Sequence, residues 1–290
     1  MVGRQGVTRL GRELERLGAR LQGRSTTPGL DAQLLLANIL QESRSWVLAH
    51  PEYCLEKQSA AALERSVSQL EKGVPLPYIL GQWEFFSLNF KLTPDVLIPR
   101  PETEQLVAMA LSWLASHPHA RQALDVGTGS GCIAITLAVH VPDLQLSATD
   151  ISPQALEVAA SNALRHGVSD RVKFSHSDLL PTGGAIFPLI LANLPYIPTR
   201  TLHELPLFGK EPSLALDGGG DGLELIRRLL LGAPAVLAPA GCLLIEIEAG
   251  QGRSAGSMAR NSFPSAVIKL HQDLAGHDRL LEVRLEGEIS

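Results

Sequence analysis

A glycine-rich turn carries the first candidate chemistry in this sequence. Residues 125–131 read Asp-Val-Gly-Thr-Gly-Ser-Gly and stand between an apolar run typical of a strand and an apolar stretch typical of a helix. Glycine tolerates positive φ and lets a ligand approach the backbone closely, and ligands of open α/β sheets bind where strands end. The pattern predicts a turn beneath a nucleoside-type ligand, formed by Asp125, Gly127, Thr128, Gly129, Ser130 and Gly131.

Acidic residues stand at the ends of the next two predicted strands. Asp150 ends the second strand, where its carboxylate can accept hydrogen bonds from both hydroxyls of a ribose. Asp178 and Leu179 follow the third strand, where they are placed to contact the amino group and the ring face of an adenine. Cys132 stands where a dinucleotide fingerprint requires its last glycine, so the spacing disfavours NAD.

A regular alternation of strands and helices must position these residues. Short apolar runs separated by helix-length segments occur at 123–126, 146–149, 172–174, 189–192, 243–247, 267–270 and 280–285. Such alternation predicts a mostly parallel sheet with helices on both faces. The segment 271–279 is too short for a crossover helix, so the last two strands are expected to pair antiparallel.

The first part of the chain predicts a separate helical unit. Leucines recur every three or four residues over 10–21, and stretches 34–40 and 60–70 show similar spacing. Glycine and prolines at 73–77 end this pattern, and the aromatic, alternating run 83–92 predicts a hairpin. Such a bundle serves either as a scaffold or as a docking surface for a macromolecular substrate. The expected domains are a helical bundle at 1–75, a hairpin linker at 76–100 and a catalytic domain at 101–290.

The composition narrows the class of protein. A hydrophobic fraction of 45% is that of a globular protein, and no apolar run of about eighteen residues is present to cross a bilayer. The formal net charge of -5 argues against binding nucleic acid through a broad cationic field. The three cysteines are far apart and the pair His117 and His119 lacks further ligands, so neither disulfides nor a metal are predicted and a cytoplasmic location is expected. Glu13 and Glu15 interrupt the arginine-rich start, which disfavours an organellar transit peptide.

The segment Asn193-Leu194-Pro195-Tyr196 follows the fourth predicted strand, and with the glycine turn and Asp150 it resembles class I methyltransferases with an (N/D)PPY-type signature. Two stretches narrow the resemblance to the PrmC/HemK family of release-factor glutamine methyltransferases. They are 97–104 (Leu-Ile-Pro-Arg-Pro-Glu-Thr-Glu) and 211–219 (Glu-Pro-Ser-Leu-Ala-Leu-Asp-Gly-Gly).

This resemblance implies both a fold and a reaction. The fold is a Rossmann-like sheet whose seven strands match the seven apolar runs, with an antiparallel last strand, after a helical domain and a hairpin linker. The reaction transfers a methyl group from S-adenosylmethionine to the side-chain amide nitrogen (N5) of the glutamine in the GGQ motif of peptide-chain release factors, in translation termination. Release factors are then the protein substrates, with no stable nucleic-acid partner and no membrane.

The role implied for residues 193–196 addresses a chemical difficulty. An amide nitrogen is a poor nucleophile because its lone pair is delocalised into the carbonyl group. If the Asn193 side-chain oxygen and the Leu194 carbonyl each accept one N–H bond, the nitrogen is held in line with the methyl group. Tyr196 is expected to pack its ring against the planar amide, and Pro195 keeps the preceding residue extended. Asn193 is also expected to contact the cofactor.

Leu194 departs from the family pattern, in which a proline is usual. NLPY is also similar to the target loop of adenine dimethylases, so N6-methylation of adenine in RNA or DNA is the alternative reaction. Two further alternatives are a cofactor-binding protein without catalysis and a nicotinamide oxidoreductase. Arg100 and Glu102 are expected near the pocket entrance, where they either contact substrate or shape the turn. Glu246 and Glu248 alternate with isoleucines on a predicted strand. One of the two is expected to face the cleft, and exposure to solvent is the alternative.

Overall fold

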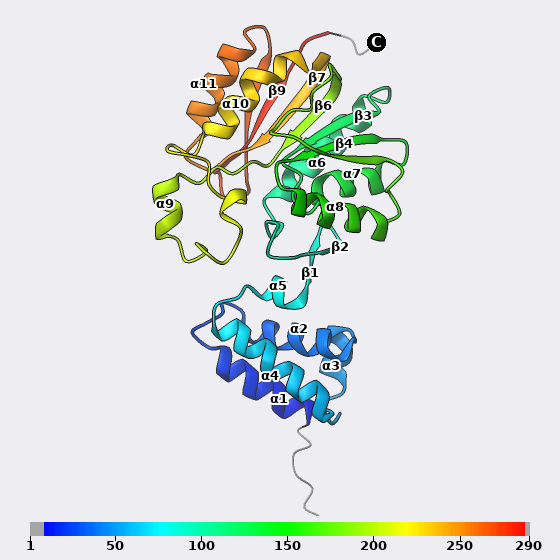
Figure 1. Cartoon of the computed structure of the whole chain (residues 1–290), viewed down its shortest axis with the longest axis vertical. Helices are drawn as coiled ribbons and strands as arrows, with labels where there is room; N and C mark the ends of the chain where they lie inside the picture. The colour runs from blue at the N-terminus through cyan, green and yellow to red at the C-terminus, as the bar shows by residue number, and fades with distance from the viewer. Residues whose placement is uncertain (1–8, 288–290) are drawn as a thin grey trace, which may run out of the picture. The chain divides into compact units, whose positions relative to one another are not determined.

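The computed structural model describes residues 9–287, which divide between Gly81 and Gln82 into two compact units (Figure 1). Within the described residues, no helix is long and apolar enough to cross a membrane. The hairpin strands fall within the second unit.

The first unit is helical. Its described helices are α1 (Leu10–Leu21), α2 (Pro28–Leu40), α3 (Arg44–Ala49), α4 (Lys57–Glu71) and α5 (Leu76–Leu80). Leu10, Leu17 and Leu21 are fully buried on one face of α1, as the leucine spacing predicts. Helix α4 ends at Glu71, as the glycine and prolines at 73–77 predict, but the short helix α5 that follows was not predicted. Pro77 lies in the first turn of α5, where a missing N–H disrupts no helical bond. Helix α3 has too few residues to show a periodic pattern.

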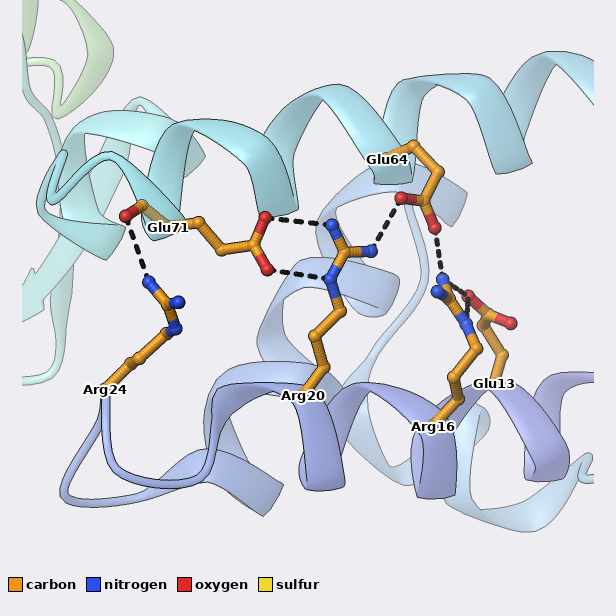
Figure 2. A network of polar contacts seen from close by, with 6 residues as sticks. All are labelled: Glu13, Arg16, Arg20, Arg24, Glu64 and Glu71. Atoms are coloured by element: carbon orange, nitrogen blue, oxygen red, sulfur yellow. Dashed lines mark hydrogen bonds and ion pairs between the residues drawn. The ribbon is translucent and has the colours of Figure 1, made fainter.

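An ion-pair network joins α1 to α4 (Figure 2). The guanidinium of Arg20 binds the Glu71 carboxylate with two bonds, Nε to Oε1 at 2.8 Å and Nη2 to Oε2 at 2.9 Å. Glu64 accepts from Arg20 at 2.7 Å and also from Arg16, which in turn binds Glu13. Glu64 therefore bridges two arginines one helical turn apart.

The second unit begins with the predicted hairpin, β1 (Gln82–Phe85) and β2 (Leu88–Lys91). The two residues of its turn, Phe86 and Ser87, both have positive φ, as tight hairpin turns require. Asn162 ties the hairpin to the rest of the unit, because it accepts from Lys91 N at 2.8 Å and donates to Lys91 O at 3.0 Å.

A seven-stranded sheet with the order β5-β4-β3-β6-β7-β9-β8 forms the centre of the described part of the second unit. Strands β3 to β7 are parallel to one another, whereas β9 is antiparallel to both β7 and β8. The predicted fold class and the antiparallel ending are confirmed. The strands are β3 (Gln122–Val126), β4 (Gln145–Asp150), β5 (Val172–His176), β6 (Phe187–Ala192), β7 (Leu237–Glu246), β8 (Val267–Gln272) and β9 (Asp278–Arg284).

Helices cover both faces of this sheet (Figure 1). Alternate residues of β6 enter two separate cores, with Leu189 and Leu191 in one and Ile190 and Ala192 in the other. The first core is completed by α6 (Thr103–Ser116), α7 (Cys132–His140) and α8 (Pro153–Arg165), and the second by α10 (Glu224–Gly232) and α11 (Gly252–Ser262). A short helix, α9 (Thr199–Glu204), and two 3-10 turns, Ser213–Ala215 and Ala233–Ala235, lie between β6 and β7 in the chain.

The strand order brings three chain segments to one edge of the sheet. Strand β3 leads to β4 and β5 on one side, and β6 then pairs with β3 on the other side. Val126 pairs with Ala192 and Ala192 with Ile245, so the residues that follow β3 and β6 lie beside the end of β7. Such a change of direction in an open sheet leaves a crevice at the carboxyl ends of the strands.

Candidate functional site

The glycine turn after β3 is held by backbone bonds to the next strand. Gly127 N and Thr128 N both donate to Thr149 O at 2.9 Å. Gly127, Gly129 and Gly131 have φ of 73°, 55° and 80°, values that side-chain-bearing residues rarely adopt. The three glycines are therefore required by the turn itself.

Asp125 lies fully buried beneath the turn. Thr128 Oγ1 donates to its Oδ2 at 2.6 Å, while Oδ1 has no hydrogen-bond partner among the described residues. Burial raises the pKa of Asp125 to about 7, which the bond from Thr128 partly offsets. The side chain supports the turn and does not line the cavity above it.

Asp150, at the end of β4, accepts one backbone bond on each carboxylate oxygen. Gly129 N donates to Oδ2 at 2.8 Å and Ser152 N donates to Oδ1 at 2.9 Å. Each carboxylate oxygen can accept two bonds, so one position on each remains for a pair of ribose hydroxyls. Ser152 also caps α8 by accepting from Ala155 N, as its position before Pro153 predicts.

A cavity of about 320 Å³ opens over this edge of the sheet. A Cβ placed on Gly129 would meet nothing within 4 Å, so the turn faces open space there. One on Gly131 would lie 2.7 Å from Ile135, so that glycine serves packing at the start of α7. An apolar pocket with a carboxylate and a bare glycine backbone fits a nucleoside-type cofactor. The predicted cofactor residues that line the cavity are Gly127, Thr128, Gly129, Ser130, Asp150, Asp178, Leu179 and Asn193.

Asp178 and Leu179 form one wall of this cavity. Leu179 has a φ of 67°, and its carbonyl accepts from Thr149 Oγ1 at 2.6 Å. Asp178 makes an ion pair of 2.7 Å with Arg228, which also lines the cavity. Sequence reasoning missed Arg228, because nothing in the surface pattern of α10 distinguishes it from the adjacent Arg227.

Asn193 is the first residue after β6, and its side-chain nitrogen is engaged. Nδ2 donates to Thr103 Oγ1 at 2.9 Å. Oδ1 therefore points away from Thr103 and is the atom available to accept a hydrogen bond. Thr103 begins α6 and is 2% exposed. The contact of Thr103 with Asn193 was not predicted, because no local pattern links two residues so far apart in the sequence.

Leu194 directs its side chain into the protein. It is 3% exposed and packs in the second core, and a Cβ on Gly127 would lie 2.9 Å from Leu194 Cδ2. The departure from proline is thus accommodated by packing against the glycine turn.

A second cavity of about 360 Å³ adjoins the first and shares Asn193, Leu194 and Pro195 with it. Tyr196 lines only this second cavity, whereas Arg100 lines both. Glu102 is exposed and lines neither. The structure thus brings all predicted substrate residues except Glu102 to the two cavities.

The stretch 211–219 supports the segment that follows β6. Ile197 N donates to Leu216 O at 3.1 Å and Gly218 N donates to Ile197 O at 2.9 Å. A Cβ on Gly218 would lie 2.8 Å from Pro195 O, so only glycine fits there. Gln251, which the sequence did not single out, donates to Tyr196 O at 2.9 Å.

Glu246, the last residue of β7, lies behind this segment and is 1% exposed. Its Oε1 accepts from Tyr196 Oη at 3.4 Å, and its Oε2 has no hydrogen-bond partner among the described residues. Burial raises the pKa of Glu246 to about 7 and also raises the pKa of Tyr196. Of the two predicted positions, Glu246 thus faces the interior, while Glu248 is exposed. Within residues 9–287, no cluster of three metal-binding side chains is present.

Two family profiles match the chain. One, described as PrmC N-terminal domain, covers residues 14–81, and the other, described as methyltransferase small domain, covers residues 105–204. The first therefore spans the helical unit and the second spans the glycine turn, Asp150 and the segment after β6.

Curated relatives match over most of the chain. The release factor glutamine methyltransferase of Moorella thermoacetica is 41% identical over 272 residues, which cover 93% of this chain and 95% of that protein. The protein of the same name from Vibrio cholerae is 39% identical over 261 residues, covering 89% and 90%. The N-terminal domain of human METTL16, solved in complex with SAH, is 14% identical, covers 87% of this chain and 94% of that one with a TM-score of 0.52, and shows a shared fold alone.

Proposed function

The chain belongs to the release factor glutamine methyltransferase family, and we propose that it methylates the side-chain amide nitrogen of a glutamine in peptide-chain release factors. The family expected from residues 97–104, 193–196 and 211–219 is confirmed, and with it a methyltransferase that uses S-adenosylmethionine. The single observation that carries the proposed chemistry is the orientation of Asn193, whose bond to Thr103 presents Oδ1 as an acceptor between the two cavities.

The cofactor is assigned to the first cavity. S-adenosylmethionine supplies a methyl group activated by its positively charged sulfur. Asp150 would bind the ribose, because each of its oxygens keeps one accepting position after its backbone bond. The glycine turn would pass beneath the nucleoside, and Asp178 with Leu179 would form the wall beside the base.

The glutamine side chain is assigned to the second cavity. Asn193 Oδ1 and the Leu194 carbonyl would each accept one N–H bond from the amide, which fixes the direction of the nitrogen lone pair. The proton becomes acidic only as the new carbon–nitrogen bond forms, so no strong base is needed before attack. Tyr196, which lines this cavity alone, would pack against the amide plane.

A labelling experiment tests this function. The protein is incubated with methyl-labelled S-adenosylmethionine, a purified release factor and total RNA, and each macromolecule is then counted. Label is expected in the release factor and should vanish when its GGQ glutamine is replaced by alanine. Label confined to RNA would instead support adenine methylation and reject the proposal.

The helical unit is proposed as a docking surface for the release factor. Its match to the PrmC N-terminal domain profile supports a role tied to this family. A short GGQ peptide and a whole release factor then differ in KM, with a much higher KM for the peptide. Equal KM values would indicate a scaffold. The net charge of -5 disfavours a stable nucleic-acid partner, and a cytoplasmic site of action is proposed because release factors act in translation.

A further inference from the structure

Glu246 is a buried acid that the proposed transfer does not use. Its place follows from the sheet, because Ala192 pairs with Ile245 and so sets Asn193 and Glu246 beside each other at the same edge. The carboxylate is 1% exposed and lines neither cavity. A carboxylate in such a position is costly unless its oxygens accept hydrogen bonds.

Between Asn193 and Glu246, the described residues leave one hydrogen-bond donor and one hydrogen-bond acceptor without a partner. Thr103 Oγ1 accepts from Asn193 Nδ2 at 2.9 Å, which leaves the single hydroxyl hydrogen of Thr103 to be donated elsewhere. Glu246 Oε2 is buried and has no partner at hydrogen-bond geometry within the described residues. Thr103 also lowers the pKa of Glu246, as a hydroxyl directed at the carboxylate does. Among the described residues, the Thr103 hydroxyl hydrogen is therefore a donor without an assigned acceptor, and Glu246 Oε2 is an acceptor without an assigned donor.

The direction of the hydrogen bonds that link Asn193, Thr103 and Glu246 matters for the reaction. An ionised carboxylate only accepts, so Thr103 must donate to Glu246 and can then only accept from Asn193. Asn193 is thereby held with Nδ2 toward Thr103 and Oδ1 toward the substrate. If the direction were reversed, the amide of Asn193 would rotate and present N–H groups to the N–H groups of the glutamine.

On the basis of the proposed function, we propose that ionised Glu246 is a positioning residue, which acts through Thr103 to orient the amide of Asn193. Charged and titratable groups on neighbouring elements interact electrostatically with Glu246. They are Glu102 on the α6 side, Arg279 from β9, Tyr196 from the segment after β6 and Cys132 from α7. Glu102 disfavours and Arg279 favours the ionised form.

The test compares Glu246→Gln with Glu248→Gln in the whole protein, using a release factor as substrate. Glutamine keeps the volume of Glu246 but can donate as well as accept. It therefore no longer fixes the direction of the hydrogen bonds that link Asn193, Thr103 and residue 246. Glu246→Gln is expected to lower kcat roughly ten- to a hundred-fold while the affinity for S-adenosylmethionine stays within about threefold. Glu248 is exposed, so Glu248→Gln should leave kcat unchanged.

Two readouts separate positioning from general damage to the fold. The kcat of the unaltered protein should rise with pH through an apparent pKa near 7 as Glu246 ionises, and this limb should be absent in Glu246→Gln. The double variant Asn193→Ala with Glu246→Gln should be no slower than Asn193→Ala alone, because Glu246 acts through Asn193. Multiplicative losses, or an unchanged pH limb, would overturn the inference.

Thr103 supplies a second test that remains decisive if Glu246→Gln does not fold. Thr103→Val keeps the shape and removes the hydroxyl, and Thr103→Ser restores the hydroxyl on a smaller side chain. Valine should lower kcat and serine should recover most of it. Equal activity of the two variants would contradict the proposed role of the Thr103 hydroxyl. If the unaltered protein does not label a release factor at all, the proposed function fails, and this failure is distinct from that of the positioning role.

Discussion

Arg100 Nη2 donates to Glu211 Oε1 at 2.6 Å, and Glu211 Oε2 accepts from Ile98 N at 3.2 Å. This contact joins the two stretches that identify the family in the sequence, although they are more than a hundred positions apart. Arg100 lines both cavities and Glu211 lines the second. The ion pair therefore fixes one side of the site against the segment that supports residues 193–196.

Replacing Arg100 should weaken both stability and activity. In Arg100→Ala the carboxylate of Glu211, with 5% of its side chain exposed, keeps only the bond from Ile98. The loss of a charged partner for a buried group is expected to lower the free energy of unfolding by about 1–3 kcal/mol, measured by denaturant titration. The matched control is Arg200→Ala, because Arg200 is 94% exposed in its pair with Glu204. Equal stability of the two variants would show that the Arg100 contact is not significant in solution.

Asn193→Ala should strongly slow transfer and preserve cofactor binding. The substitution removes one of the two acceptors that hold the amide nitrogen, and a fall in kcat of roughly a hundred-fold or more is expected. Binding of S-adenosylmethionine, measured by calorimetry, should remain largely intact because Asp150 and the glycine turn are unchanged. Asn261→Ala, at an exposed position of α11, is the control and should behave as the unaltered protein. Parallel loss of binding and transfer would contradict the role of Asn193.

Gly129→Val should remove cofactor binding. Gly129 has a φ of 55° and open space where a Cβ would stand, so a branched side chain would enter the cavity. Backbone strain alone is controlled by Gly184→Val, since Gly184 has a φ of 76°, also faces open space and does not line the cavity. Both variants should lose some stability, but only Gly129→Val should fail to bind S-adenosylmethionine in calorimetry. A Gly184→Val protein that also fails to bind would point to strain instead of steric exclusion.

Glu64→Gln should make the helical unit less stable in a pH-dependent way. The hydrogen bonds from Arg20 and Arg16 hold the pKa of Glu64 below its ordinary value of 4.5. A lowered pKa means that the stabilisation is present above pH 4.5 and is lost as the pH falls through the folded-state value. Because Glu64 is half exposed, the effect at neutral pH should stay below about 1 kcal/mol and shrink with added salt.

Thermal unfolding at pH 7 and pH 3.5 measures this effect of Glu64. Glu42→Gln, at an exposed position outside the network, is the control. A difference between the Glu64 and Glu42 variants that persists unchanged at low pH would show that charge pairing is not its source.

The regular elements of the fold could be read from the sequence because their patterns are local. Leucine spacing along 10–21 and apolar runs such as 189–192 report which side of an element is buried. The short helices α3 and α5 were not predicted from the sequence, since they have too few turns to show a periodic pattern. Strand β7 begins at Leu237, earlier than the apolar run at 243, because Phe187 pairs with Leu237 before an irregularity in the register.

Sequence also determined which residues could bind the two ligands. Glycines at fixed spacing, Asp150 after a strand and the segment 193–196 are defined by backbone needs and side-chain chemistry that hold wherever the chain places them. Only the tertiary structure decided what supports them. Thr103, Glu211 and Glu246 are distant from Asn193 in the chain, and no periodicity links a helix start, a loop and a strand end. Their contacts arise because parallel strands β3, β6 and β7 end at one edge, where α6 begins and buried polar groups must find partners.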